Sequence, residues 1–248
     1  MANNYFQFKQ FTIHQDRCAM KVTTDGCLFG AWAAEKIRSS ANSGSKLEIQ
    51  NALDIGSGTG LLSLMIAQQT NTNIDAIEID KEAYEQGKEN IARSPWADKI
   101  NLIHSDVKEF SGLKQYDAII SNPPFYENEL KSASSKKNKA HHDEGLLLED
   151  LLTIIQQNLK SAGEFYLLLP YKRNDEIETC FAKNGLAILH KALVRQSTQH
   201  NYFRIMLAGK YEANKKGDFD ITEIAIRNEK QVYTNEFIQL LKDYYLYL

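Results

Sequence analysis

The sequence NALDIGSGTG, residues 51–60, decides the fold, because an apolar run there ends in three alternate glycines, Gly56, Gly58 and Gly60. A largely apolar, helix-like run, residues 61–69, follows directly. Glycine at a strand-to-helix turn lets the backbone approach a ligand where a Cβ would collide. The spacing is not the G-x-G-x-x-G of dinucleotide sites, and no Gly-Lys-[Ser/Thr] follows to hold a triphosphate. The stretch predicts a parallel α/β sheet with a cofactor site at this turn.

Three carboxylates at successive strand ends indicate which cofactor this is. Asp54 suits S-adenosylmethionine, which carries ammonium and sulfonium cations and no pyrophosphate, and it would repel the phosphates of NAD or ATP. Glu78 is placed to accept the ribose hydroxyls, and Asp106 to accept an adenine amine, with the Val107 amide as a donor to a ring nitrogen. The alternative is that Asp54 and Asp106 cap helices and Glu78 is solvated. Together with the glycines, the pattern favours S-adenosylmethionine.

Short apolar runs alternate with amphipathic runs along the rest of the chain, as in α/β proteins. The expected strands are residues 52–55, 74–79, 100–104, 116–121, 165–169, 187–195, 202–211 and 220–227. The expected helices are residues 26–36, 60–69, 81–93, 146–159, 173–183 and 234–247. The last three strands follow one another without long helices, which predicts an antiparallel edge. Residues 39–46, rich in Ser, Asn and Gly, are expected to form a solvated loop.

The second motif is Asn122-Pro123-Pro124-Phe125, directly after the fourth expected strand of the sheet. The prolines fix φ and donate no hydrogen bonds, so nearby carbonyls can point into a cleft as acceptors. A planar substrate bearing an NH₂ group can donate to Asn122 and to the Pro123 carbonyl while it stacks on Phe125. Holding the amine in line with the methyl group would be the main catalytic contribution. The alternative is an ordinary Pro-Pro turn.

A lysine-rich segment, residues 127–143, follows this motif and is either a solvated loop or a substrate-gripping one. Its candidate phosphate-binding residues are Lys131, Lys136, Lys137 and Lys139. Lys172 and Arg173 are further candidates for substrate binding.

Composition sets wide bounds on the function. The 248 residues carry a net charge of −3, so any attraction to nucleic acid must come from a local basic patch. The three cysteines form no CxxC pair, which predicts neither a disulfide framework nor a metal site. No secretion signal or membrane-spanning run is visible, so we expect a cytoplasmic protein without a membrane partner. The sequence leaves the oligomeric state open.

Together these residues resemble a known family. Residues 54–60 resemble the first motif of class I S-adenosylmethionine-dependent methyltransferases, and residues 122–125 resemble the [DNS]-P-P-[YFW] motif of their amine- and amide-methylating branch. Residues 8–11, 16–22 and 24–26 resemble the N-terminal block of the bacterial tRNA1(Val) adenine-N6 methyltransferases. Residues 94–97 and 244–246 extend the resemblance to nearly the whole chain.

The resemblance implies a Rossmann-like, mostly parallel seven-stranded sheet with an antiparallel edge and helices on both faces. It implies one methyltransferase domain, with residues 1–50 covering cofactor and substrate and residues 51–248 forming the core. It also implies methylation of N6 of adenine 37 in tRNA1(Val), beside the anticodon, with tRNA as partner. Lys21 and Thr24 would lie near the amino-acid end of the cofactor, or Thr24 would cap a helix. Phe125 occupies a position where Tyr is also frequent, so a hydroxyl contact there is in doubt.

Other functions share these motifs. Glutamine methylation in a release factor uses the same chemistry, although about fifty residues before Asp54 are too few for the helical N-terminal domain usual in that family. Guanine-N2 methylation of ribosomal RNA and adenine-N6 methylation of DNA are not separated by residues 122–125. A catalytically inactive cofactor-binding scaffold is the non-enzymatic alternative, and it would have no need of an intact Asn-Pro-Pro-Phe motif.

Overall fold

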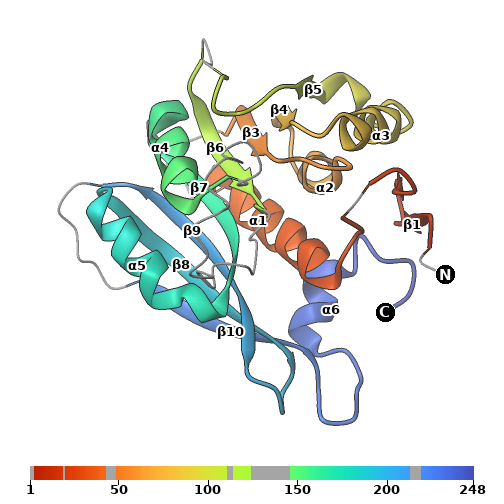
Figure 1. The fold of residues 1–248 in the computed structure, drawn as a ribbon. Coiled ribbons are helices and arrows are strands. Elements are labelled where there is room, and N and C mark those ends of the chain that lie inside the picture. Colours follow the sequence, from red (N-terminus) through yellow and green to blue (C-terminus); the bar gives the residue numbers. More distant parts are fainter. Residues whose placement is uncertain (1–2, 19, 43–48, 111–113, 124–145, 213–218) are drawn as a thin grey trace, which may run out of the picture.

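The fold is a large sheet with helices on both faces (Figure 1). The structure, a computed structural model, describes residues 3–18, 20–42, 49–110, 114–123, 146–212 and 219–248. The strands are β1 (Tyr5–Gln7), β2 (Thr12–His14), β3 (Asn51–Ile55), β4 (Asn73–Glu78), β5 (Ile100–His104), β6 (Tyr116–Ser121), β7 (Leu159–Pro170), β8 (Leu186–Ser197), β9 (Tyr202–Tyr211) and β10 (Asp220–Arg227). The helices are α1 (Thr24–Asn42), α2 (Leu61–Gln69), α3 (Lys81–Ala92), α4 (Leu148–Asn158), α5 (Asn174–Lys183) and α6 (Asn235–Leu241), with short 3-10 turns at Ala97–Lys99 and Tyr171–Arg173.

The main sheet has the strand order β10-β8-β9-β7-β6-β3-β4-β5. Every neighbouring pair is parallel except the two pairs that β9 makes, with β7 and with β8. The carboxyl ends of the other seven strands therefore point to one edge of the sheet, where open α/β sheets bind their ligands.

Alternation along the strands creates two cores, one on each face of the sheet. In β3, for example, Ala52 faces the core beneath α1, α2 and α6, and Leu53 faces the core beneath α4 and α5. Both side chains are almost fully buried. Strands buried on both faces read as continuous apolar runs, which explains why these runs stood out in the sequence.

The N-terminal hairpin β1–β2 lies outside the main sheet and is fastened to the other end of the chain (Figure 1). The Lys9 amide donates to the Tyr244 carbonyl at 2.8 Å, and Phe8 forms an isolated antiparallel bridge with Tyr245. The ring of Phe8 stacks on that of Phe11, 4.5 Å away, and both are buried. Residues 8–11 and 244–245 thus form one aromatic cluster.

The fold class expected from the sequence is confirmed, with differences in detail. The sheet has eight strands rather than seven, because β10 adds to β8 in parallel. The antiparallel strand β9 lies inside the sheet, not at its edge, since it folds back from β8 and inserts between β7 and β8. The predicted loop at residues 39–46 is wrong over 39–42, which continue α1. The terminal helix stops at Leu241, and hairpin β1–β2 was not anticipated.

The inner position of β9 requires a glycine. A Cβ on Gly209 would lie 2.4 Å from Cζ of Phe165 in β7 and 2.8 Å from the Ala187 carbonyl oxygen in β8. We predict that Gly209→Ala lowers the melting temperature by roughly 2–12 °C, as overpacking does in a chain of this size. Thermal unfolding of Gly209→Ala, Phe165→Leu and the double variant measures this. The losses in melting temperature of the two single variants should sum to more than the loss in the double variant. Additive losses would contradict the close approach of Gly209 to Phe165.

Candidate functional site

The ends of β3, β4 and β6 meet at the carboxyl edge of the sheet. Ile55 is in register with Ile77 on one side and with Ser121 on the other. The amides of Gly56 and Ser57 both donate to the Ile77 carbonyl, at 2.9 and 3.0 Å, and the Ser121 hydroxyl donates to the Ile55 carbonyl at 2.8 Å. The glycine turn and residue 122 are therefore neighbours, although they are far apart in the sequence.

The glycine turn is shaped to admit another molecule. Gly56, Gly58 and Gly60 have φ values of 72°, 54° and 84°, a left-handed conformation that side chains disfavour. A Cβ built on Gly56 or Gly58 would meet no atom within 4 Å, so the space in front of these two backbones is open. Gly60 instead turns inward, where its Cβ would lie 3.3 Å from Ile91. The outer two glycines leave room for a ligand, and the third packs against α3.

Asp54 is the most unusual charged group of the site. Its side chain is fully buried, and its Oδ2 accepts a 2.6 Å hydrogen bond from the Ser63 hydroxyl. Its Oδ1 is buried with no hydrogen-bond partner. Burial raises the pKa of this carboxyl from 3.8 to about 7, against the opposing effect of the Ser63 hydrogen bond. The carboxyl also lies against the first turn of α2, where the Ser63 backbone lowers its pKa, but its Oδ1 lacks the donor or cation that a buried carboxylate requires.

Glu78 is buried too, but each of its carboxylate oxygens accepts a hydrogen bond. Its Oε2 accepts from the Gly58 amide at 2.7 Å, and its Oε1 accepts from the Asp80 amide at 2.8 Å. The alternative of a solvated Glu78 is therefore wrong. Glu78 holds the glycine turn against the end of β4, and a carboxylate has lone pairs left for hydroxyl donors. A role toward the ribose stays a prediction.

Asp106 and Val107 follow the end of β5 in a short turn. The Asp106 Oδ1 accepts from the Lys108 amide at 2.8 Å, so this carboxylate caps a turn rather than the helix that the alternative had expected. Both Asp106 and Val107 are partly buried, and Val107 packs against the core on the α4 and α5 face. Their contacts with an adenine stay a prediction.

Asn122 and Pro123 directly follow β6, and Asn122 is partly buried. The start of α1 approaches Asn122 closely: a Cβ on Gly26 would lie 3.9 Å from the Asn122 Nδ2. Thus the N-terminal block, the glycine turn and the second motif meet at one place. Pro124, Phe125 and the lysines of residues 127–143 (Lys131, Lys136, Lys137 and Lys139) lie outside the described residues.

The other predicted residues lie at the same edge, in varied settings. Lys21 donates to the Gln15 carbonyl. Thr24, at the start of α1, lines a pocket with residues of β8, β9 and β10. Lys172 and Arg173 form the turn after β7, and the Arg173 Nε donates to Glu176 at 2.7 Å. The structure therefore brings Asp54, Glu78 and Asn122 to adjacent strand ends, and sets Thr24 beside them on α1.

Two residues of α3 support the site and were missed in the sequence. Gly87 has no room for a side chain, because its Cβ would lie 2.8 Å from the Gly58 carbonyl oxygen. Asn90 is buried and donates to the carbonyls of Thr59 and His14 at 3.0 and 2.9 Å, while it accepts from the His14 amide at 2.9 Å. A polar Asn and a Gly on one face of an amphipathic helix were the available signals.

The comparisons with known proteins agree with this arrangement. Residues 42–176 match the family described as the methyltransferase small domain. A tRNA1(Val) (adenine(37)-N6)-methyltransferase from Dyadobacter fermentans is 41% identical over 248 residues, which cover 98% of this chain and 98% of the relative. The chain belongs to the tRNA1(Val) (adenine(37)-N6)-methyltransferase family. This membership agrees with the resemblance carried by residues 16–26 and 122–125.

Solved structures share the fold at lower identity. A predicted O-methyltransferase from Agrobacterium tumefaciens has a TM-score of 0.62 and 15% identity, covering 88% of this chain and 96% of that one. A glycopeptide N-methyltransferase in complex with S-adenosyl-L-methionine has a TM-score of 0.51 and 10% identity, covering 71% and 93%. At these identities the likeness establishes the Rossmann-like methyltransferase fold alone.

The described residues lack two further kinds of feature. Within those ranges, no cluster of three or more His, Cys, Asp or Glu side chains could hold a metal ion. Over the same part of the chain, no helix is both long and apolar enough to cross a membrane.

The raised pKa of Asp54 has a measurable consequence for stability. The folded protein holds this proton more tightly than the unfolded chain, so ionising Asp54 costs folding free energy as pH rises from about 4 to about 7. Asp54→Asn keeps an acceptor for Ser63 but does not titrate. We predict that, across this pH range, the melting temperature of the unliganded wild type falls relative to that of Asp54→Asn, and that the difference is constant above it. If the melting temperatures of the wild type and of Asp54→Asn change in parallel from pH 4 to 8, the pKa of Asp54 is not raised.

Proposed function

We propose that the protein transfers a methyl group from S-adenosylmethionine to the N6 amine of adenine 37 in tRNA1(Val). The observation that carries the proposal is Asn122-Pro123 at the end of β6, beside the glycine turn, in a chain 41% identical over its length to a relative that bears this activity in its name. The cofactor supplies an electrophilic methyl group on a sulfonium. All remaining work is positioning by this chain.

The residues at the edge of the sheet fit S-adenosylmethionine. The unpartnered oxygen of buried Asp54 suits a cationic group nearby, which would favour the ionised carboxylate. The open space before Gly56 and Gly58 accepts the cofactor against bare backbone. We assign Glu78 to the ribose hydroxyls, and Asp106 with the Val107 amide to the adenine. Lys21 and Thr24 are assigned to the amino-acid end.

The substrate amine is assigned to Asn122 and the Pro123 carbonyl, which accept its two protons as hydrogen bonds. These bonds orient the nitrogen lone pair toward the methyl group, while Phe125 stacks on the adenine ring. The target base must leave its stack in the anticodon loop to reach this position. The methylated amine then loses its surplus proton to water. Residues 1–50 would cover cofactor and substrate, and residues 1–248 would act as one domain.

One assay separates this function from its alternatives. Purified protein is given labelled S-adenosylmethionine with tRNA, ribosomal RNA, DNA or a release factor, each unmodified. We expect transfer to tRNA alone, and its loss when adenine 37 of tRNA1(Val) is replaced by guanine. Transfer to another substrate identifies the corresponding rival function, and no transfer to any of them indicates a cofactor-binding scaffold.

We predict that Asn122→Ala reduces single-turnover methyl transfer to tRNA1(Val) roughly a hundredfold or more, because a misplaced nucleophile loses that much in rate. Cofactor affinity, measured by titration calorimetry, should stay within a few-fold of the wild type. Asn122→Ser keeps an acceptor and should retain more activity than Asn122→Ala. Near-normal turnover by Asn122→Ala would refute the assigned mechanism.

A separate prediction concerns the four lysines of residues 127–143, which follow Asn122-Pro123-Pro124-Phe125 closely in the sequence. Replacing Lys131, Lys136, Lys137 and Lys139 with Ser should weaken tRNA binding and flatten its dependence on salt, because fewer phosphates are neutralised. Cofactor affinity should not change. Four Ser substitutions at Lys81, Lys88, Lys99 and Lys114, away from the motif, serve as a charge-matched control. If the dependence of tRNA binding on salt is unchanged, these four lysines do not contact phosphates.

A further inference from the structure

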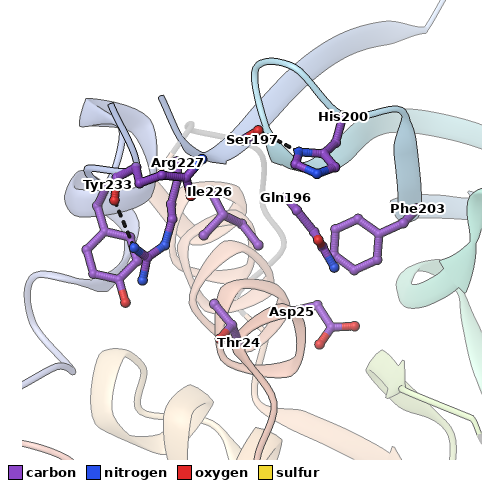
Figure 2. A pocket seen from close by; sticks show the side chains of 10 residues that line it. Thr24, Asp25, Gln196, Ser197, His200, Phe203, Ile226, Arg227 and Tyr233 are labelled. Carbon is purple, nitrogen blue, oxygen red and sulfur yellow. Dashed lines mark hydrogen bonds between the residues drawn. The ribbon is translucent and has the colours of Figure 1, made fainter. Parts of the chain in front are cut away.

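A pocket of about 380 Å³ lies between the start of α1 and the ends of β8 and β10 (Figure 2). This volume is at the lower end of the range for small-molecule sites. Its walls come from parts of the chain that are far apart in sequence. The residues that matter here are Asp25, Gln196, His200, Phe203, Arg227 and Tyr233. Neither the cofactor nor the amine site proposed above uses any of these six.

The pocket opens at the same edge of the sheet as Asn122. Strands β8 and β10 run parallel to β7 through the antiparallel β9, so their carboxyl ends and the start of β9 share that edge. Asp25 lines the pocket. A Cβ added to the next residue, Gly26, would lie 3.9 Å from the Asn122 Nδ2. The first turn of α1 thus separates the pocket from the proposed amine site. A substrate held at Asn122 would continue past this turn.

Two cations are held against the aromatic rings of the pocket. The Arg204 guanidinium lies 5.4 Å from the Phe203 ring centroid, and its Nε donates to Asp25 at 2.8 Å. The Arg227 guanidinium lies 4.8 Å from the Tyr233 ring centroid. Phe203 and Tyr233 are partly buried and pack against the core at one side. Tyr233 also stacks on Phe237, 4.6 Å away, so its ring is covered, whereas Phe203 has no aromatic ring stacked on it among the described residues and can offer a flat surface.

Polar groups stand around these rings. In Figure 2, the amide of Gln196 lies beside the Phe203 ring, and Asp25 is on the α1 side of the pocket. The His200 ring is fixed by its Nδ1, which lies 2.6 Å from the Ser197 hydroxyl. An amide, a carboxylate and an imidazole next to aromatic rings are the set that recognises the edges and faces of unstacked bases.

The rim of the pocket is a strained, braced turn. Gln231 has φ of 60°, the single non-glycine residue with positive φ among the described residues. Its carbonyl accepts from Arg227 at 2.8 Å. The Asn228 side chain accepts from the Lys230 and Val232 amides at 2.9 and 3.1 Å, which braces the turn. Strain of this kind tends to occur where a ligand or clamp needs it, and here it sets the position of Arg227.

We propose that this pocket binds the base of a nucleotide that flanks the target adenine in the tRNA anticodon loop. The base stacks on Phe203, Gln196 and Asp25 contact its edge, and Arg227 lies near the adjoining phosphate. The inference rests on the proposed function, since it names how that substrate is gripped. Splaying a neighbour out of the loop stack also leaves the target base unstacked on one side and freer to reach Asn122.

The test is a thermodynamic cycle between the protein and the RNA. Phe203→Leu and wild type are assayed for kcat/KM on an unmodified anticodon stem-loop of tRNA1(Val) and on stem-loops abasic at the nucleotide before or after adenine 37. Phe203→Leu should lose roughly five- to a hundredfold on the intact loop, the usual worth of stacking one base. On one of the abasic stem-loops, Phe203→Leu and the wild type should have the same kcat/KM. Tyr211→Leu, at the opposite end of β9 and 48% exposed, is the matched control and should match the wild type.

Each outcome has one meaning. Additive losses on both abasic loops, or no loss from Phe203→Leu, would overturn the pocket assignment and leave the proposed function standing. A weaker cofactor affinity in Phe203→Leu, measured by titration calorimetry, would overturn it as well, because the pocket would then serve the cofactor. Failure of the wild type to methylate whole tRNA1(Val) would overturn the proposed function and the pocket with it. If Phe203→Leu folds poorly, the same cycle is measured with Gln196→Ala, because Gln196 is exposed and its replacement should not disturb the fold.

Discussion

Helix α3 lies so close to the glycine turn that no side chain fits between them. A Cβ on Gly87 would lie 2.8 Å from the Gly58 carbonyl, and one turn later Asn90 donates to the Thr59 carbonyl. Asn90 also exchanges two hydrogen bonds with His14 of the N-terminal hairpin. The turn and the segment that leads to α1 are therefore positioned by the same helix. The distance between the glycine turn and Asn122 depends on this contact as well as on the sheet.

Two buried carboxylates at this edge differ in their hydrogen bonding. Each oxygen of Glu78 accepts one hydrogen bond, from the Gly58 or the Asp80 amide, which holds the turn. Asp54 has one buried oxygen without a partner, and burial raises its pKa. A folded protein keeps an unsatisfied polar group of this kind at a cost in stability. That cost is reasonable where a ligand completes the bonding.

Much of this could be read from the sequence because it depends on local pattern. The eight strands of the main sheet follow from apolar runs, and Asp54, Glu78 and Asn122 fall at strand ends by position alone. Contacts between segments that are far apart in the chain were harder to predict from the sequence. The insertion of β9 beside β7 depends on the clearance at Gly209, and Asn90 acts through contacts with His14 and Thr59 that no single run of sequence reveals. The pocket beside α1 unites three distant segments, residues 24–25, 196–203 and 226–233. Residues 124–145, which carry the rest of the second motif, lie outside the described structure.

The aromatic cluster of residues 8–11 and 244–245 has a consequence for biosynthesis. A ribosome makes residues 8–11 more than two hundred residues before the Tyr244 carbonyl that accepts from Lys9. The hairpin that leads to residues 16–26 thus cannot complete its pairing until residues 244 and 245 have been made. A glycine turn that folds before then lacks the fully anchored hairpin beside α3.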